Sequence, residues 1–286
     1  MINLSELKKL LSLEKTKDNN FTGQNYKTEW GRVFGGQVLG QSLHAAYQTV
    51  PEDRIAHSMH GYFILGGDIN VPINYHVDNI RDGKSFTTRR VIAYQKGKAI
   101  FIMAASFQLN QEGVNHQINM PNVLTPDLLL TDLQQAINLK KVDSERYEKI
   151  LKSHPKVFEF KPVEKATFLQ TRNSLPKSHV WFKTKEKVNA KISFQHQLLA
   201  FASDYSLLLT ATLPHREKLF GKKIFYASLD HAIWFHRQFK IDDWLLYSMQ
   251  SPSASNSRGF TLGNIFNQAG EMVASVSQEG LIRAYK

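Results

Sequence analysis

The chain has 286 residues, a length that fits either one large domain or two ordinary ones. Hydrophobic residues make up 42% of it, with 18 Phe and 10 Tyr, which is enough apolar surface for a packed core and excludes wholesale disorder. It contains no Cys, which excludes disulfides, thiolate zinc sites and a cysteine nucleophile. The net charge of +11 fits a nucleic acid, an anionic membrane, a phosphate-rich small molecule or simply a basic surface, and does not choose among them.

The N-terminal segment and the apolar runs argue against secretion and membrane insertion. Residues 1–17 form an amphipathic Leu/Lys pattern without a signal-peptide core. No apolar run approaches the roughly 18 residues needed to cross a bilayer. We therefore expect a soluble, unsecreted protein without a membrane span.

Residues 32–50 have the periodicity of a helix with one apolar face. Leu39, Leu43, Ala46 and Val50 recur at spacings of four, three and four residues. Four segments rich in Phe, Ile, Val, Tyr and Thr follow, and they predict antiparallel strands joined by hairpins. These segments are residues 57–65, 72–80, 86–94 and 99–109.

The stretch between the two halves has the composition of a surface linker with helices. Thr125-Pro126-Asp127 is a helix start, because Thr can cap a helix and Pro is tolerated in the first turn. A charged second helix is predicted around residues 144–152. We expect this segment to pack on the surface.

The second half repeats the order of one helix followed by strands. A second one-faced helix is predicted from apolar residues that fall four, three, four and three positions apart, at Phe194, Leu198, Phe201, Tyr205 and Leu208. Similar strand residues recur at separations of 170 to 174 residues. The matched pairs are Tyr62-Phe63 with Trp234-Phe235, Tyr75 with Tyr247, residues 84–86 with 258–260, and residues 104–108 with 274–278.

A helix followed by an antiparallel meander, found twice at a near-constant offset, indicates a duplicated α+β domain. A repeat array is disfavoured because its period would be about 20–50 residues. We expect an N-terminal domain at residues 1–115, a linker with surface helices at 116–165 and a C-terminal domain at 166–286.

The two helices differ at positions that can carry chemistry. Residues 34–43 align with residues 195–204 without a gap. The first helix begins with Gly35 and Gly36, which let a ligand approach the free N–H groups and the positive end of the helix dipole. The second helix carries Asp204 where the first has Leu43. If the halves form a pseudo-dimer, one junction combines donors and acid and the other has neither, which predicts one complete site per chain.

Two further polar residues lie in strand-like runs. Ser228 lies in the run of residues 224–229, and Gln278 continues the apolar run of residues 272–276; polar side chains in such strands need hydrogen-bond partners. A shared site with Asp204 would supply them. A purely structural interpretation stays open, in which the two glycines form only a tight turn and the acid is an exposed helix residue.

Other catalytic and metal-binding motifs do not fit the sequence. It has no Gly-x-Ser-x-Gly elbow, no His-Glu-x-x-His, no Walker-type phosphate loop and no dinucleotide glycine fingerprint. His57, His60, His231 and His236 have no recognised ligand spacing. We expect them to be strand or core histidines.

Taken together, these residues resemble the acyl-CoA thioesterase II family, whose members are double-hotdog enzymes. The resemblance extends nearly from end to end of the chain. Its most specific motifs here are Val33-Phe34-Gly35-Gly36-Gln37, Asp82-Gly83-Lys84-Ser85-Phe86, Arg89-Arg90-Val91, Ala202-Ser203-Asp204, Leu229-Asp230-His231, Trp234-Phe235-His236-Arg237, Trp244-Leu245-Leu246-Tyr247 and Ser277-Gln278-Glu279-Gly280.

The resemblance implies a pseudo-dimer of two fused, helix-wrapped antiparallel sheets that hydrolyses acyl-CoA to a fatty acid and coenzyme A. The family's catalytic Asp falls on Asp204 and its Gln on Gln278, while its hydroxyl position, usually Thr, falls on Ser228. Ser keeps the hydroxyl and lacks the methyl group, so hydrogen bonding should survive with a less fixed rotamer. In the implied mechanism Asp204 accepts a proton from an attacking water that Ser228 and Gln278 orient.

Gly35 and Gly36 are expected to bind substrate, and we hypothesise that the Gly36 N–H group is the oxyanion donor. The resemblance implies acyl-CoA as the partner, self-association into a homo-oligomer, and no metal or redox cofactor; no nucleic-acid partner is expected. Residues 283–286 are not a Ser-Lys-Leu address, so a cytoplasmic location is expected. Two other functions stay open, an acyl-CoA-binding pseudo-enzyme and a hotdog hydratase that would use an Asp and His pair.

Overall fold

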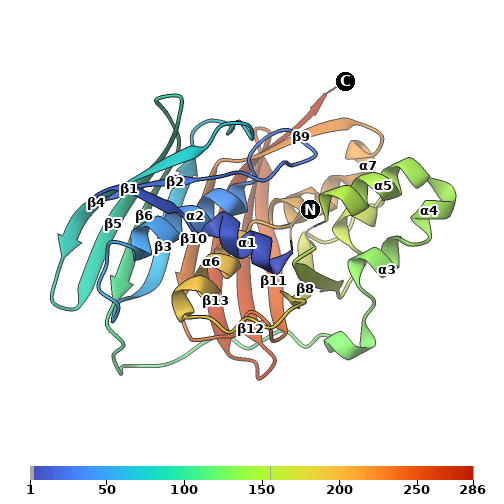
Figure 1. Ribbon diagram of the computed structural model, residues 1–286. Coiled ribbons are helices and arrows are strands. Elements are labelled where there is room, and N and C mark those ends of the chain that lie inside the picture. Colours follow the sequence, from blue (N-terminus) through green and yellow to red (C-terminus); the bar gives the residue numbers. More distant parts are fainter. Residues whose placement is uncertain (1–2, 155, 286) are drawn as a thin grey trace.

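The computed structural model describes residues 3–154 and 156–285, and the strands of these residues form one antiparallel sheet (Figure 1). The strand order is β1-β2-β4-β5-β6-β3-β10-β13-β12-β11-β8-β7, with β9 paired to β13. The first half of the chain therefore supplies one side of the sheet and the second half the other. The predicted α+β class is confirmed. No helix of the described residues is long and apolar enough to span a membrane.

The first half forms the predicted helix and meander, preceded by a short helix and hairpin. Along β6 the side chains of Phe101, Met103, Ala105 and Phe107 are buried, as the two-residue period of a strand requires. The elements are α1 (Leu4–Leu11), β1 (Glu14–Lys17), β2 (Asn20–Gly23), α2 (Gly35–Tyr47), β3 (Ile55–Phe63), β4 (Ile73–Asp82), β5 (Phe86–Gln95) and β6 (Lys98–Gln108).

The linker contains more structure than its sequence predicts. Its short helices are η1 (Pro126–Leu128), α3 (Asp132–Ala136), α4 (Leu139–Val142) and α5 (Ser144–Ser153). The strand β7 (Phe158–Pro162) also falls inside the predicted linker, yet it pairs antiparallel with β8 and forms an edge of the sheet. The sheet of the second half thus begins before residue 166.

The second half follows the same plan, except that its helix is shorter than predicted. The helix α6 (Ile192–Ser203) is capped by Asp204, and Ser206 adopts a left-handed backbone conformation with φ of 66°. The expectation that one helix continues to Leu208 is therefore wrong. The remaining elements are η2 (Thr167–Leu169), β8 (Lys177–Thr184), η3 (Leu208–His215), α7 (Arg216–Leu219), β9 (Lys223–Ser228), β10 (Asp230–Phe235), β11 (Leu245–Ser255), β12 (Arg258–Asn267) and β13 (Met272–Tyr285).

The two halves meet with a local two-fold relation. In the β3–β10 ladder His60 lies opposite Ala232, and on either side of this pair Tyr62 lies opposite Asp230 and Ser58 opposite Trp234. The match of Tyr62 with Trp234 made from the sequence is confirmed by this register. The central helices α2 and α6 cross in the same way, because Gly36 approaches Phe201 while Gly40 approaches Gln197.

The register corrects two of the matches made from the sequence. Residues 84–86 do not correspond to residues 258–260, because Phe86 pairs with Gln108 and Arg258 pairs with Leu281, which makes Arg258 the counterpart of Phe86. Ala104 pairs with His60, and the residue that pairs with the equivalent Ala232 is Ser277. The counterpart of Ala104 is therefore Ser277 and not Ala274. Because strand side chains alternate between faces, the predicted alignment set exposed Ala104 against buried Ala274.

One core unites the halves, and a buried arginine ties a sheet to a helix end. The largest cluster of buried apolar side chains includes Leu39 and Phe101 of the first half and Leu198 and Ile233 of the second.

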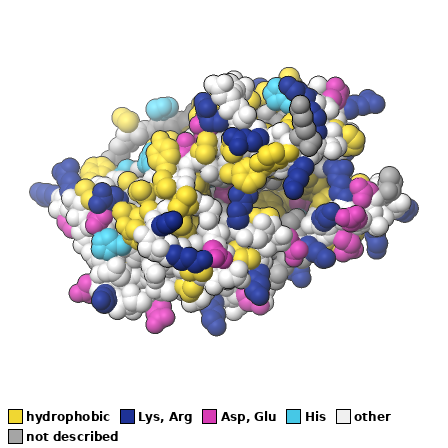
Figure 2. Space-filling view, turned by 90° about the horizontal axis from the view of Figure 1, so that it is seen from above, with side chains coloured by type: hydrophobic (Ala, Val, Ile, Leu, Met, Phe, Trp, Pro, Cys, Tyr) yellow, Lys and Arg dark blue, Asp and Glu magenta, His cyan; other side chains and the backbone are white. Residues whose placement is uncertain are grey.

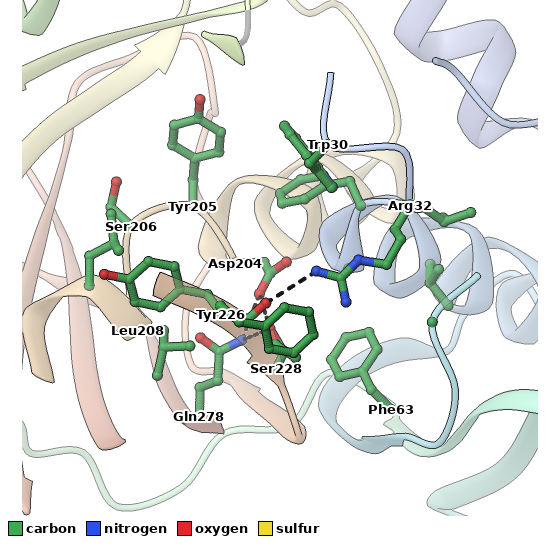
Figure 3. A pocket seen from close by; sticks show the side chains of 18 of the residues that line it. Trp30, Arg32, Phe63, Asp204, Tyr205, Ser206, Leu208, Tyr226, Ser228 and Gln278 are labelled. Carbon is green, nitrogen blue, oxygen red and sulfur yellow. Dashed lines mark hydrogen bonds between the residues drawn. The ribbon is translucent and has the colours of Figure 1, made fainter. Parts of the chain in front are cut away.

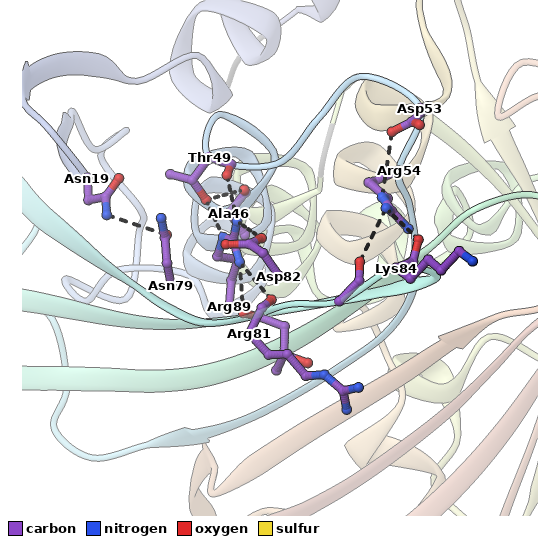
Figure 4. A network of polar contacts seen from close by, with 12 residues as sticks. Asn19, Ala46, Thr49, Asp53, Arg54, Asn79, Arg81, Asp82, Lys84 and Arg89 are labelled. Carbon is purple, nitrogen blue, oxygen red and sulfur yellow. Dashed lines mark hydrogen bonds and ion pairs between the residues drawn. The ribbon is translucent and has the colours of Figure 1, made fainter.

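Arg89 in β5 connects the sheet to the end of α2. Its side chain is 1% exposed, and it donates to the backbone carbonyl of Thr49 after α2 and to two further carbonyls on β4 and β5 (Figure 4).

Candidate active site

A cavity of about 820 Å³ opens where the two halves and the linker meet. Its wall includes Phe63 and Ile100 from the first half, Tyr226 from β9, and Phe160 and Phe168 from the linker and the segment after it. Most of this wall is apolar. In Figure 2, hydrophobic side chains gather in the middle of the face seen from above, with Lys and Arg side chains among and around them.

Asp204 enters this cavity from the end of α6 (Figure 3). It is the C-terminal cap of the helix, and its side chain is half-buried. The C-terminal end of a helix carries a partial negative charge, which disfavours a carboxylate there. Other donors must therefore hold the anion.

The first donor comes from the other half of the chain. The N–H group of Gly36, in the first turn of α2, donates to Asp204 Oδ2 over 2.9 Å. This helix has no side-chain cap, so its first N–H groups are free to bind an outside acceptor. A Cβ atom on Gly35 would lie 2.6 Å from Asp204 Oδ2, and one on Gly36 would lie 2.3 Å from the carbonyl oxygen of Phe201. Only glycine permits this approach.

The second and third donors come from β13 and β9. Gln278 Nε2 donates to Asp204 Oδ1 over 2.6 Å and to Ser228 Oγ over 2.9 Å. Ser228 Oγ donates to Asp204 Oδ1 over a longer 3.3 Å. The two residues meet because β13 pairs first with β10 and then with β9, which sets Ser228 opposite Gly280.

The carboxyl group of Asp204 titrates near neutrality. Burial raises its pKa to about 6, although the hydrogen bonds from Gln278, Gly36 and Ser228 each lower it. Removal from water thus outweighs the three donors. A carboxylate with such a pKa is both deprotonated and appreciably basic at neutral pH.

The structure brings together all five residues singled out from the sequence, with one change of partner. Asp204, Ser228 and Gln278 converge, and the start of α2 at Gly35 and Gly36 faces them, as the comparison of the two helices predicts. Gly36, however, donates its N–H to Asp204 and not to an open site. The hypothesis that this group is the oxyanion donor does not fit that contact.

Sequence reasoning missed a buried network that supports the end of α6. His231 Nε2 lies 2.9 Å from Ser203 Oγ, and Tyr247 donates to the carbonyl oxygen of Ser203 over 3.1 Å. Burial lowers the pKa of His231 to about 3, so its ring is neutral at pH 7. Both His231 and Tyr247 belong to the motifs that carry the family resemblance, which could have indicated this network. The sequence alone predicts only that His231 is a strand or core residue.

The opposite junction lacks the same chemistry. Leu43, the counterpart of Asp204, is fully buried in the core. The position of Gly35 is taken by His196, which is 2% exposed and stacks on Phe235 with ring centroids 4.0 Å apart. Burial lowers the pKa of His196 to about 3, and its Nδ1 atom bonds to Tyr47.

The histidines considered as metal ligands have other contacts. His57 bonds to Ser106, His236 bonds to Ser275, and the ring of His60 packs edge-on against Trp234. Within residues 3–154 and 156–285, no group of three or more His, Asp or Glu side chains could hold a metal ion.

The fold is that of a double-hotdog protein, because the two halves share one antiparallel sheet and their central helices cross. Comparison with known proteins supports this class. The sequence profile of the acyl-CoA thioesterase family matches residues 154–281, and that of the acyl-CoA thioesterase N-terminal domain matches residues 26–108.

Individual relatives span the whole chain. Acyl-CoA thioesterase 2 of Haemophilus influenzae is 40% identical over 285 residues, covering 98% of each chain. The crystal structure of an acyl-CoA thioesterase II from Mycobacterium marinum has a TM-score of 0.80 at 37% identity and covers 98% of this chain and 99% of that one. A hot dog fold protein from Alicyclobacillus acidocaldarius, at 16% identity, has a TM-score of 0.77 and supports the fold alone. The chain belongs to the acyl-CoA thioesterase family and is a thioester hydrolase.

Proposed function

We propose that the protein hydrolyses acyl-CoA thioesters with a water molecule activated by Asp204. The observation that carries the proposal is the meeting of a basic carboxylate, two side-chain donors and a helix start at one cavity between the halves. The relatives named as acyl-CoA thioesterases support the choice of substrate.

The hydrogen bonds of Gln278 are directed at the base and at Ser228. Both hydrogens of its amide nitrogen are donated, one to Asp204 and one to Ser228. An ionised Asp204 can only accept, which favours the amide nitrogen of Gln278 on the side that faces it. The oxygen, Oε1, is buried and accepts no hydrogen bond from the described residues. Oε1 therefore does not contact the cavity, and the attacking water is proposed to donate one hydrogen to Asp204, which lines the cavity and is held in place by Gln278 and Ser228.

The reaction follows from this arrangement. The water oxygen attacks the thioester carbonyl carbon while its proton passes to Asp204, giving a tetrahedral intermediate with a negatively charged oxygen. The carbon–sulfur bond then breaks, the proton on Asp204 passes to the leaving sulfur, and the products are a carboxylic acid and coenzyme A thiol. No covalent intermediate with the protein forms. A positioned general base contributes typically about 10²–10⁴-fold to such a rate.

The N–H group of Gly35 is the oxyanion donor in this proposal, replacing that of Gly36. Gly35 is the first residue of α2 and lines the cavity. Its N–H group donates to none of the acceptors of the described residues. The positive end of the helix dipole also favours the developing charge. In this proposal the Gly36 N–H group binds the carboxylate of Asp204, and the Gly35 N–H group binds the negatively charged oxygen of the transition state.

The apolar wall around Phe63, Ile100 and Phe160 offers room for the acyl chain. A broad range of acyl lengths, self-association and a cytoplasmic location stay predictions from the resemblance.

The direct test is a free-thiol assay with purified protein and saturated acyl-CoA substrates of increasing length. Hydrolysis in the wild type, with a loss of about 10²-fold or more in kcat for Asp204→Asn, is the expected result. Binding without thiol release would indicate a binding protein, and turnover of enoyl-CoA alone would indicate a hydratase. Wild-type turnover in Asp204→Asn would refute the role of Asp204.

A further inference from the structure

One partly buried cation lies outside the catalytic group and has no counter-charge. Arg216, the first residue of α7, has buried Nε and Nη2 atoms that form no hydrogen bond within the described residues. Guanidinium nitrogens shielded from water and left without an acceptor are costly. The arginines that do form ion pairs within those residues are Arg54, Arg89, Arg90 and Arg258. An acceptor from outside the chain would remove the cost at Arg216.

A second arginine faces the same region. Arg146 of α5 donates through Nη2 to the carbonyl oxygen of Phe168 over 2.6 Å. Phe168 belongs to η2, which packs against η3, and η3 runs directly into Arg216. The helices α5 and α7 lie together at one end of the molecule (Figure 1). Burial lowers the pKa of Arg216, and the charge of Arg146 lowers it further.

These two arginines stand beside the cavity that contains the base. Phe168, which Arg146 contacts, and Tyr226, which lies within electrostatic range of Arg216, both line that cavity. A third cation, Arg32, reaches the cavity from the first half and lies over the ring of Phe225 at 4.5 Å (Figure 3). Arg32 also donates through Nη2 to the carbonyl oxygen of Tyr226 over 3.4 Å, so all three arginines lie near the part of the cavity formed by the linker and β9.

We propose that Arg146 and Arg216 bind a phosphate group of the coenzyme A part of the substrate. The inference rests on the proposed function. Coenzyme A carries its phosphates at the far end of the pantetheine arm from the thioester, so their site must lie beside the cavity and away from the base. The planar guanidinium group donates two parallel hydrogen bonds to phosphate oxygens, and a second arginine compensates more of the charge. The Nε and Nη2 atoms of Arg216, which are buried in this structure, would supply the two parallel hydrogen bonds once the side chains that cover them move aside.

The test compares an acyl-CoA with the S-acyl-pantetheine that carries the same acyl group but no phosphate. For Arg216→Ala we expect KM for acyl-CoA to rise about 10- to 100-fold, as for loss of hydrogen bonds to a charged group. The kcat for acyl-CoA and both constants for acyl-pantetheine should stay within about twofold. Arg146→Ala should raise the same KM by a smaller factor, because that arginine also bonds to Phe168. Arg216→Lys should lie between wild type and Arg216→Ala.

Lys218→Ala is the matched control, since Lys218 is an exposed cation on the same helix. It should leave KM for both substrates unchanged. An equal loss on both substrates in Arg216→Ala and Arg146→Ala, or a wild-type KM that is the same with and without phosphates, would overturn the site. A wild type that hydrolyses neither thioester would instead refute the proposed function. If Arg216→Ala fails to fold, Arg216→Lys and Arg146→Ala decide the matter.

An acyl-dephospho-CoA identifies which phosphate is bound. If the penalty of Arg216→Ala disappears with this substrate, the 3′-phosphate is the ligand; if it persists, the pyrophosphate is.

Discussion

At the scale of single residues, the candidate site depends on the surroundings of one carboxylate, which set its pKa. Asp204 sits at the end of α6 that disfavours negative charge, and burial raises its pKa to about 6. The hydrogen bonds from Gln278, Gly36 and Ser228 each lower this pKa and so limit its rise. A carboxylate with this pKa is ionised at pH 7 and suits the proposed role of a base that takes a proton from water.

This pKa sets the pH dependence of the reaction. The base works only when deprotonated, so kcat/KM should fall tenfold per pH unit below about pH 6 and level off above about pH 7. The measurement is a pH–rate profile for the free enzyme with an acyl-CoA. A profile that is flat between pH 5 and 8 would contradict the role of Asp204 as the base.

The same pKa predicts a stability effect with a defined sign. The pKa of Asp204 is raised from 3.8 to about 6 on folding, so the native state binds more protons than the unfolded state between these values. Its stability contribution is therefore present at pH 4 and lost as pH rises through 6. We expect Asp204→Asn to be more stable than wild type at pH 7, by on the order of 1–3 kcal/mol, and less so at pH 4. Denaturant unfolding at both pH values tests this.

Bond lengths rank the two side chains that hold the base. The hydrogen bond from Gln278 to Asp204 is 2.6 Å, whereas that from Ser228 is 3.3 Å, beyond the usual range for a hydroxyl donor. We expect Gln278→Ala to lower kcat by about 10- to 100-fold and Ser228→Ala by less than about tenfold. Ser228→Thr keeps the hydroxyl and should retain activity. If Ser228→Ala and wild type had equal kcat, the hydroxyl of Ser228 would not take part in the reaction.

At the scale of elements, the sequence predicts periodic faces well and boundaries poorly. The apolar faces of α2 and the strands of the first half are where the spacing of Leu39 and Leu43 and the alternating strand residues put them. The end of α6 was missed because Ser206 takes a left-handed conformation without the glycine that usually signals it. The strand β7 was missed because it is short and ends in Pro162, which is tolerated at a sheet edge.

Register is harder still, as β13 shows. Ala274 and Ala104 look alike in sequence, but their side chains point to opposite faces of the sheet. A similar run of residues in two strands does not show how each strand is aligned with its neighbours. The register follows only from the observed pairing of the strands. The prediction of Asp204, Ser228 and Gln278 does not depend on register, because it rests on residue type and on the family resemblance. The actual partner of Gly36 could not be predicted, since it depends on a contact between the halves.

The buried Arg89 illustrates an element held by one side chain. It contacts three backbone carbonyls and Asp82, so Arg89→Ala would remove these four partly buried hydrogen bonds and leave a cavity where a fully buried side chain was. We expect a loss of about 2–4 kcal/mol in the free energy of unfolding, with kcat of the folded protein unchanged. Paired thermal melts and kinetics test this, and a selective loss of kcat would show that the arginine acts on the site.

At the scale of the whole molecule, the duplicated halves differ at their two junctions, and we expect a single working site per chain. Leu43 and His196 occupy the positions at the second junction that correspond to Asp204 and Gly35. We expect calorimetric titration with a non-hydrolysable acyl-CoA thioether to give one ligand per chain. Two equivalent ligands per chain would show that the second junction also binds substrate.

The hydrogen bond between Gly36 and Asp204 joins residues 168 positions apart, one from each half. The second half alone supplies Asp204, Ser228 and Gln278, but it lacks the Gly36 donor and the proposed oxyanion donor, Gly35, which come from the first half. In a refolding experiment, backbone signals should therefore return before catalysis does. The recovery of thiol release would then be a kinetic record of when the two halves dock.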